Sequence, residues 1–490
     1  MKKAMAIGLA AILLVSALAG CSGNIPSAEM DGVLIQLSDE QITVNGSAAS
    51  SDPTQAVYTA NDIIYYESGR DFTYGEGKEM DAHSKEEADA HTVVHITKPG
   101  RYILSGQLSR GQVAVDLGKD AEDDPNAVVT LVLEGVDITC EVAPAIIFYN
   151  VYECGDKDVS SPYIDTSRAG ANVEIADGTV NNVTGAYVAK IYKPESVELN
   201  KDGTEVKDAK KLHKYDAAFY SKMSMNVHGN TGVLNVRAAN EGLDTEMHLT
   251  INGGHINIRS GNDGINTNED GVSVTAIRGG TVNIRVDGST GEGDGIDSNG
   301  YLVIDGGTVI AQACSFSMDA GIDSDMGIQL NGGTVIATGN MLDHIGQSGQ
   351  NYAVFQFTGK KQSEEVVLKN ADGQTVVQEK LENEFSILVI SAPEMKEGEY
   401  TLWLDGVRQQ GMAGQGMGGM KPPQEMGRPE GMEPPEDMPQ KPEGMQPPPK
   451  PEGMEGMQPP ESQGFGDPSM GSVKNTFSIT EGGSYFQVIA

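Results

Sequence analysis

A short acidic phrase recurs four times between residues 240 and 325, and it constrains the fold more than any other feature. Its copies read EGLDT, DGINT, DGIDS and AGIDS and span Glu241–Thr245, Asp263–Thr267, Asp294–Ser298 and Ala320–Ser324. Each copy lies close to a glycine pair that leads into a β-branched run, and these pairs begin at Gly253, Gly279, Gly306 and Gly332, in steps of 26, 27 and 26 residues. Repetition at such a period is typical of a solenoid, in which each repeat is one coil that buries its apolar face against its neighbours.

The local patterns of the chain favour coils made of strands. From residue 92 onward, short β-branched segments follow one another, each bounded by Gly, Pro, Asn or Asp. Helical periodicity of useful length is missing almost everywhere. The lysine-rich, hydrophilic segment 190–214 is expected to be a loop inserted into one coil. We therefore predict an all-β fold in which residues 31–345 form a β-solenoid. Residues 346–408, together with 472–490, are expected to form a small antiparallel β cap that covers the last apolar face.

The N-terminal residues and the segment 409–471 differ in composition from the strand-like regions. Residues 1–20 combine Lys2 and Lys3 with a short apolar run, and the following Leu18–Cys21 (LAGC) reads as a bacterial lipobox. We expect a cleaved lipoprotein signal peptide, lipidation at Cys21, a tether over 21–30 and a location on the extracellular face of the bacterial cell membrane. Residues 409–471 hold 14 of the 22 prolines and 10 of the 21 methionines, which predicts an extended disordered coil.

The net charge of −36 limits the partners of the chain. A strongly acidic protein is a poor match for nucleic acid or for anionic lipid, so membrane contact is expected through the lipid anchor alone. Acidity is compatible with divalent cations. No zinc-type cysteine pair occurs, so a bound metal is expected to be a hard cation held by oxygen. Cys140 and Cys154 either form a disulfide, which export permits, or stay as thiols.

The acidic residues of the repeat are the candidate metal ligands. Alternation along each phrase predicts that one set of residues points inward and the next set outward: Leu243, Ile265, Ile296 and Ile322 inward, and Asp244, Asn266, Asp297 and Asp323 outward. If coils stack at roughly 4.8 Å, these residues form a column of carboxylates that repel one another unless something neutralises them. Taken singly, Asp and Asn are ordinary turn residues. Taken as a column, they suit calcium, which binds six to eight oxygens. We predict the metal ligands among Asp263, Asp294, Asp297, Asp319, Asp323 and Asp325.

Several segments together resemble the bacterial carbohydrate-binding β-helix lipoprotein family. They are the repeat itself, Gly100–Gly106 (GRYILSG), Thr130–Thr139 (TLVLEGVDIT) with Pro144–Ile146 (PAI), Val389–Pro393 (VISAP) and Glu399–Leu402 (EYTL). The resemblance implies a right-handed parallel β-helix similar to pectate lyases, with calcium along the helix and binding of polygalacturonate and cellulose-like polymers. The acidic column of the family maps onto Asp263, Asp294, Asp297 and Asp323. Asn266 and Ala320 depart from it, which places the expected cation around Asp294, Asp297 and Asp323.

The sequence thus predicts a lipid-anchored extracellular protein, expected as a monomer, that binds acidic (pectic) or cellulosic polysaccharide with the help of calcium. One alternative is a calcium-dependent polysaccharide lyase, for which the candidate bases are Lys222, Arg259, Arg278 and Arg285. Another is a structural or adhesion protein that uses the solenoid as a spacer. No catalytic residue is assigned, since no hydrolase motif stands out.

Overall fold

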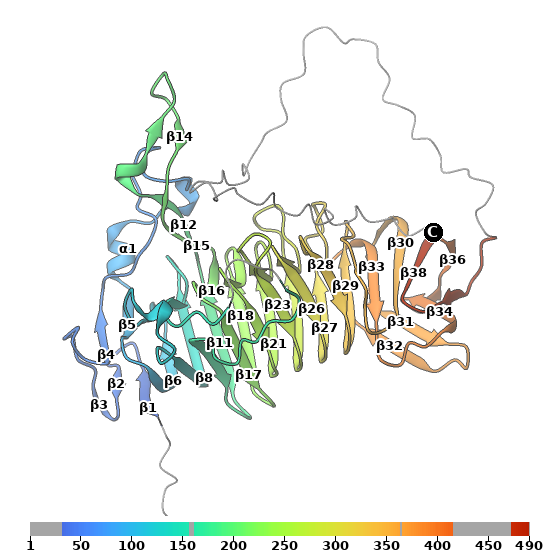
Figure 1. Cartoon of the computed structure of the whole chain (residues 1–490), viewed down its shortest axis with the longest axis horizontal. Helices are drawn as coiled ribbons and strands as arrows, with labels where there is room; N and C mark the ends of the chain where they lie inside the picture. The colour runs from blue at the N-terminus through green and yellow to red at the C-terminus, as the bar shows by residue number, and fades with distance from the viewer. Residues whose placement is uncertain (1–31, 156–160, 363–364, 415–471, 490) are drawn as a thin grey trace, which may run out of the picture.

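The structure, a computed structural model, describes residues 32–155, 161–362, 365–414 and 472–489, and nearly all of its regular structure is β-strand. Strands stack side by side along the long axis of the molecule (Figure 1). Most of them belong to three ladders of parallel strands, and successive coils add one strand to each ladder in turn. Antiparallel strands lie at both ends of the stack, so the large sheets are mixed.

The first two ladders belong to one large sheet. The first contains β1 (Val33–Leu37), the opening halves of β6 (Gly100–Leu108) and β8 (Val129–Cys140), β10 (Ala171–Ile175), β17 (Met225–Gly229), β20 (Leu249–Ile251), β23 (Val274–Ile277), β26 (Tyr301–Ile304) and β28 (Gly327–Leu330). The second contains the closing halves of β6 and β8, β11 (Val180–Gly185), β18 (Val233–Ala238), β21 (His255–Ser260), β24 (Thr281–Val286), β27 (Thr308–Gln312) and β29 (Thr334–Gly339).

The third ladder carries the acidic phrase. It contains β5 (Thr92–Ile96), β7 (Gly111–Asp116), β9 (Ile146–Asn150), β16 (Ala217–Ser221), β19 (Glu241–Thr245), β22 (Ile265–Thr267) and β25 (Ile296–Ser298). At the N-terminal end, β4 (Val57–Ala60) adds to β5 in the antiparallel sense, as do β2 (Thr43–Val44) to β1 and β3 (Ser47–Ala48) to β2.

The apolar residue of each phrase packs inside the stack, as the sequence predicts. Leu243, Ile265 and Ile296 are register partners, Ile296 bridges to Ile322, and all four side chains are at most 2% exposed. The second glycine of each pair has a positive φ, at Gly254 (93°), Gly280 (82°), Gly307 (80°) and Gly333 (77°). Glycine adopts this conformation at the turn between ladders without a steric penalty, which explains why the pair recurs.

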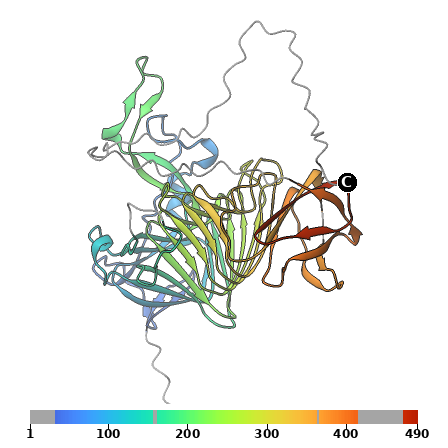
Figure 2. The same cartoon turned by 45° about the vertical axis from the view of Figure 1, so that its right-hand side comes forward.

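The C-terminal strands pack around a second hydrophobic core, and Figure 2 brings these strands forward. They are β30 (Tyr352–Lys361), β31 (Val366–Asn370), β32 (Thr375–Glu379), β33 (Phe385–Ser391), β34 (Gly398–Leu404), β35 (Val407–Arg408), β36 (Gln410–Ala413), β37 (Phe477–Ile479) and β38 (Gly483–Ile489). β33 runs antiparallel to β29 and continues the second ladder. Within the segment 409–471, expected to be coil, β36 pairs with β38, and residues 415–471 lie outside the described ranges.

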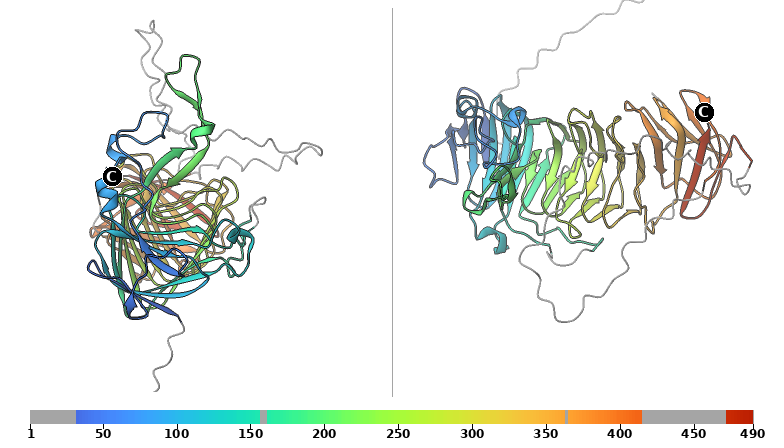
Figure 3. Two further views of the ribbon diagram at one scale, coloured as in Figure 1. Left: turned by 90° about the vertical axis from the view of Figure 1, so that its left-hand side faces the viewer. Right: turned by 90° about the horizontal axis from the view of Figure 1, so that it is seen from above.

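A hairpin projects from the side of the stack (Figure 3). Its stem is β12 (Val188–Tyr192) with β15 (Lys211–Tyr215), and its tip is η3 (Pro194–Ser196) and β13 (Glu198–Leu199) with β14 (Val206–Asp208). The sequence predicts a loop here, but paired strands form because apolar stem residues such as Ile191 are buried. Beside it lie η1 (Glu79–Asp81) and α1 (Lys85–Asp89), and the segment carrying them contacts the stem through the ion pair of Glu76 with Lys190, at 2.8 Å.

Three further expectations concern cysteines and membranes. Cys140, Cys154 and Cys314 are free thiols, so the alternative of a disulfide between the first two is wrong in this structure. Cys21 and the signal segment lie outside the described residues. Within the described residues, none of the helices has the length and apolar character needed to span a membrane.

Candidate functional site

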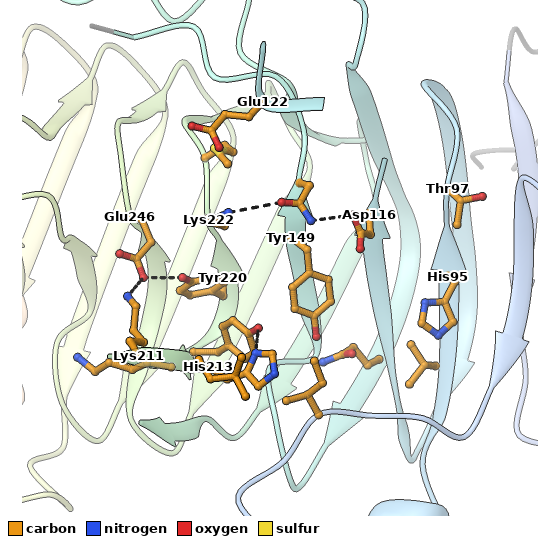
Figure 4. Close-up of a pocket in the computed structure, with 18 of the residues that line it drawn as sticks. His95, Thr97, Asp116, Glu122, Tyr149, Lys211, His213, Tyr220, Lys222 and Glu246 are labelled. Atoms are coloured by element: carbon orange, nitrogen blue, oxygen red, sulfur yellow. Dashed lines mark hydrogen bonds and ion pairs between the residues drawn. The ribbon is translucent and has the colours of Figure 1, made fainter. Parts of the chain in front are cut away.

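A cleft with a volume of about 680 Å³ lies where the hairpin stem faces the third ladder. Figure 4 shows that strands of this ladder and the hairpin contribute side chains to the same space. Its lining is mainly aromatic, acidic and basic, and includes Tyr58, Asp62, His95, Asp116, Glu122, Tyr149, Asn150, Lys211, His213, Lys214, Tyr215, Tyr220, Lys222, Glu246 and Glu269.

Tyrosine rings form one wall of this cleft. Tyr215 of the hairpin stem meets Tyr149 of β9 and Tyr220 of β16 edge to face, with ring centroids 5.4 and 5.1 Å apart. Farther along, Tyr58 of β4 stacks on His95 of β5 at 4.4 Å. Burial raises the pKa of Tyr149, Tyr215 and Tyr220. These phenols are therefore neutral at physiological pH and can act as hydrogen-bond donors beside an apolar ring face.

Polar groups at fixed positions complete the cleft. The carboxylate of Glu246 accepts hydrogen bonds from the Tyr220 hydroxyl at 2.6 Å and from Lys211 Nζ at 3.0 Å. Lys222 Nζ donates to Asn150 Oδ1 at 3.4 Å, and Asn150 Nδ2 donates to Asp116 Oδ1 at 2.9 Å. A concave site of this size, with ring faces and a few oriented donors and acceptors, is suited to a polar ligand that also has apolar faces.

Three buried carboxylates lie next to the cleft, at the start of the acidic column. Oxygens of Asp216, Glu241 and Asp244 lie within 4.8 Å of one another, and all three residues are buried. Burial, and then the neighbouring carboxylates, raise the pKa of Glu241 and Asp244 well above the usual range. On the hairpin side, Lys214 Nζ lies 2.7 Å from Asp216 Oδ2.

One oxygen of each inner carboxylate is satisfied and the other is not. Glu241 Oε1 accepts from Asn266 Nδ2 at 3.3 Å, and Asp244 Oδ1 accepts from Asn268 Nδ2 at 2.7 Å. Glu241 Oε2, Asp244 Oδ2 and Asn266 Oδ1 have no hydrogen-bond partner in the part of the chain that the structure describes. Buried polar atoms without partners are rare and costly, so this set of oxygens fits a cation.

The acidic residues predicted as metal ligands continue the column along the following coils. Asp263 Oδ1 accepts from the Asp294 amide at 2.7 Å, Asp294 Oδ1 from the Ala320 amide at 2.6 Å, and Asp319 Oδ2 from the Gly293 amide at 2.6 Å. In register, Asn266 pairs with Asp297. Asp323 follows the Ile296–Ile322 bridge and, like Asp297 and Asp325, has charged neighbours in the column.

Three of the predicted ligands connect neighbouring coils. Asp263, Asp294 and Asp319 each accept a hydrogen bond from a backbone amide 26 or 31 residues away, which differs from the local turn role that the sequence allows for them. The tightest carboxylate group of the described residues lies earlier in the column, at Asp216, Glu241 and Asp244. Sequence reasoning missed Asp216 and did not include Glu241 or Asp244 among the predicted ligands. Strand register, which places Ala217 beside Glu241, brings Asp216 to the start of the column.

The expectation that the residues beside the inner apolar position face solvent is wrong for Asp244 and Asn266, which are 0% and 7% exposed. Lys211 and Lys214 of the hairpin lie near enough to Asp244 to offset part of the rise in its pKa, so the hairpin lies beside this edge of the stack. The acids therefore titrate in a poorly hydrated column rather than on an open edge.

This burial predicts an unusual pH dependence of stability. Burial and the neighbour Asp343 raise the pKa of Asp323 to about 7, whereas the unfolded chain titrates near the ordinary value of 3.8. The folded state holds the proton to higher pH, so the free energy of unfolding should fall as pH rises from about 4 through 7. Urea denaturation in chelator, followed across that range, measures the slope. Asp323→Asn should reduce the slope of the free energy of unfolding against pH. An unchanged slope in this variant would contradict the assignment of the pH dependence to Asp323.

The chain is similar in sequence and structure to known proteins. The family model described as "Carbohydrate-binding domain-containing protein" matches residues 90–378, more than half of the chain. A curated protein of that description from Acetivibrio thermocellus is 33% identical over 162 residues, which is 33% of this chain and 43% of the relative. The chain thus aligns with less than half the length of that relative. A solved structure of a polysaccharide lyase-like protein from C. thermocellum, a gadolinium derivative, is similar with a TM-score of 0.37 and 21% identity, over 65% of this chain and 92% of the other.

Proposed function

Because the chain belongs to the carbohydrate-binding domain-containing protein family, we propose that it binds polysaccharide in the tyrosine-lined cleft. The observation that carries this proposal is the meeting of ring faces with oriented polar groups in one cleft. A sugar ring has an apolar face, which packs on a tyrosine, and hydroxyls at its rim, which bond to carboxylates and amides. Tyr149, Asn150 and Glu246 offer these contacts.

We further propose that the polymer is pectic or cellulosic. Lys211, Lys214 and Lys222 line the cleft together with five carboxylates, so they support an acidic, polygalacturonate-like ligand through individual ion pairs rather than through a net positive charge. The proposal includes export and lipid attachment at Cys21, on the basis of the N-terminal sequence. It also includes a right-handed parallel β-helix, on the basis of three parallel ladders that the chain visits in turn.

Calcium is proposed as the resident cation, held by Asp216, Glu241 and Asp244. The support is the three oxygens without partners and the shared burial of the carboxylates. Calcium accepts carboxylate and amide oxygens in a flexible surround, so Asn266 can serve as a further ligand. The cation would neutralise the start of the column and stabilise the wall of the cleft from behind.

Affinity electrophoresis tests the cleft. The full chain should be retarded in gels that contain polygalacturonate or a soluble cellulose derivative, and Tyr149→Ala combined with Lys222→Gln should weaken retardation about tenfold. Tyr163→Ala is the matched control, since Tyr163 is 77% exposed and does not line the cleft. Equal retardation of the cleft variant and the wild type on every polymer would refute this site.

A further inference from the structure

The outer face of the second ladder carries two rows of like residues. On β18, β21 and β24, Arg237, Arg259 and Arg285 are register partners. Two residues earlier on the same strands, Asn235, Asn257 and Asn283 form a parallel row. Figure 1 shows β18 and β21 side by side in the middle of the stack. Because strands alternate sides, both rows lie on the face opposite the buried Ile256 and Ile258.

Two asparagines of the row, Asn235 and Asn257, are linked by hydrogen bonds along the axis of the stack. Asn235 Nδ2 donates to Asn182 Oδ1 at 3.0 Å, and Asn257 Nδ2 donates to Asn235 Oδ1 at 2.9 Å. Each bond uses one of the two N–H groups of a side chain. The row therefore presents amide donors at every rung, roughly 4.8 Å apart, to whatever lies against the face.

The arginine row concentrates positive charge in a chain whose net charge is −36. Guanidinium groups on adjacent rungs repel one another, so the row is unfavourable unless anions neutralise it. Glu382, which precedes β33, contacts two of the three: its Oε1 lies 3.5 Å from Arg259, and its Oε2 pairs with Arg285. Among the described carboxylates, none forms an ion pair with Arg237. The row is thus only partly neutralised by the protein itself.

The face has a defined end. On the next rung, β27 places Ile310 and Gln312 in the two rows, and both are buried. Ile310 and Ile336 pack into the second core, and Gln312 Oε1 accepts the amide of Glu382 at 2.7 Å. The C-terminal segment thus covers the rows where they become apolar and partly covers Arg285, whose Nε donates to Asn383 Oδ1 at 2.9 Å. Arg237 and Arg259 stay exposed. Side-chain exposure of 56% for Arg259 agrees with this.

We propose that this Asn–Arg face binds a carboxylated linear polysaccharide, which runs along the stack with one carboxylate per arginine. The rung spacing is close to the advance of one sugar unit along such a polymer. Guanidinium groups hold carboxylates through paired N–H bonds, and the amides reach the hydroxyls of the same sugar. The inference deepens the proposed function, because it adds a second surface for an acidic polymer that is separate from the cleft and makes no use of metal.

Substitution of the arginines and substitution of Glu382 are expected to change polymer binding in opposite directions. Its carboxylate competes with the polymer for Arg259 and Arg285. Arg237→Gln with Arg259→Gln should weaken binding of the full chain to polygalacturonate about tenfold, whereas Glu382→Gln should strengthen it about twofold or more. A merely structural role of these residues would weaken binding in both variants. Arg110→Gln is the control, because Arg110 is an exposed arginine that pairs with Glu141 elsewhere.

The experiment is affinity electrophoresis in calcium on three polymers, with circular dichroism to verify folding. If the arginine variant loses retardation on polygalacturonate but keeps it on neutral hydroxyethylcellulose, the result supports binding at the Asn–Arg face. Weaker binding in Glu382→Gln, or an equal effect of the arginine variant on the neutral polymer, overturns it. Stronger loss on dextran sulfate than on polygalacturonate overturns the choice of a carboxylated ligand. The Tyr149→Ala and Lys222→Gln variant is run beside these, so failure of the cleft is distinguished from failure of the Asn–Arg face.

Discussion

Calcium at about one hundred times its Kd is expected to raise the free energy of unfolding by about 2.7 kcal/mol, and Glu241→Gln with Asp244→Asn is expected to remove this gain. The unfolded chain lacks the preformed site, so calcium binds mainly the folded state. In the folded state it satisfies the oxygens of Glu241 and Asp244 that have no partner. Thermal or urea denaturation of the full chain, in calcium and in chelator, measures the difference.

The same variant should behave in the opposite way without calcium. Removing two buried acidic groups relieves the repulsion with Asp216, so the variant should be more stable than the wild type in chelator. Glu394→Gln with Glu397→Gln makes the same change of charge at exposed positions and should leave the calcium response intact. If the Glu241 and Asp244 variant keeps the full response to calcium, the cation binds elsewhere, and the predicted group around Asp294, Asp297 and Asp323 becomes the next site to test.

Ile296→Ala is expected to lower the free energy of unfolding by about 2–5 kcal/mol, the range for truncating a buried isoleucine. Ile296 is 0% exposed and packs between Ile265 and Ile322 on adjacent rungs, where neighbouring coils leave little room to collapse. Val180→Ala, on the outer side of β11 at 56% exposure, should change stability by only about 0.5 kcal/mol. Urea denaturation monitored by circular dichroism compares the two, and equal losses would refute inward packing of the phrase.

Local patterning was enough to predict the ladders from the sequence. Alternation fixes which residue of each phrase is buried, and the 26–27-residue step fixes which residues become neighbours, so Leu243, Ile265, Ile296 and Ile322 were predictable as one inner row. The glycine pairs were predictable as turns for the same reason. Such inferences need only the geometry of a strand and a constant coil length.

The candidate site depends on contacts between segments whose distance in sequence is not set by the repeat period. Coil length is irregular before residue 217, so the distance in sequence between Tyr149 of β9 and Tyr215 of the hairpin gave no sign that their rings meet. The hairpin was also predicted as a loop, because its lysines obscured the apolar positions of its stem. Asp244 lies near the lysines of this hairpin and is buried, whereas the sequence predicted an exposed edge at this position.

For the arginine row, the sequence drew attention to two of its residues but not to their arrangement. Arg259 and Arg285 stood out in the sequence as candidate bases of a lyase, but nothing in their spacing connected them to Glu382, which is 97 residues from Arg285. Strand register, rather than motif, brings Arg237 into the same row.

The antiparallel pairing of β33 with β29 also sets the length of the molecule. A parallel stack ends in a strand whose outer N–H and C=O groups can pair with another chain. The repeat itself does not determine where the stack ends. β33 runs in the reverse direction and occupies that edge from Val335 to Gly339. A second molecule therefore cannot extend the second ladder end to end at this position, which restricts self-association there to the sides of the stack.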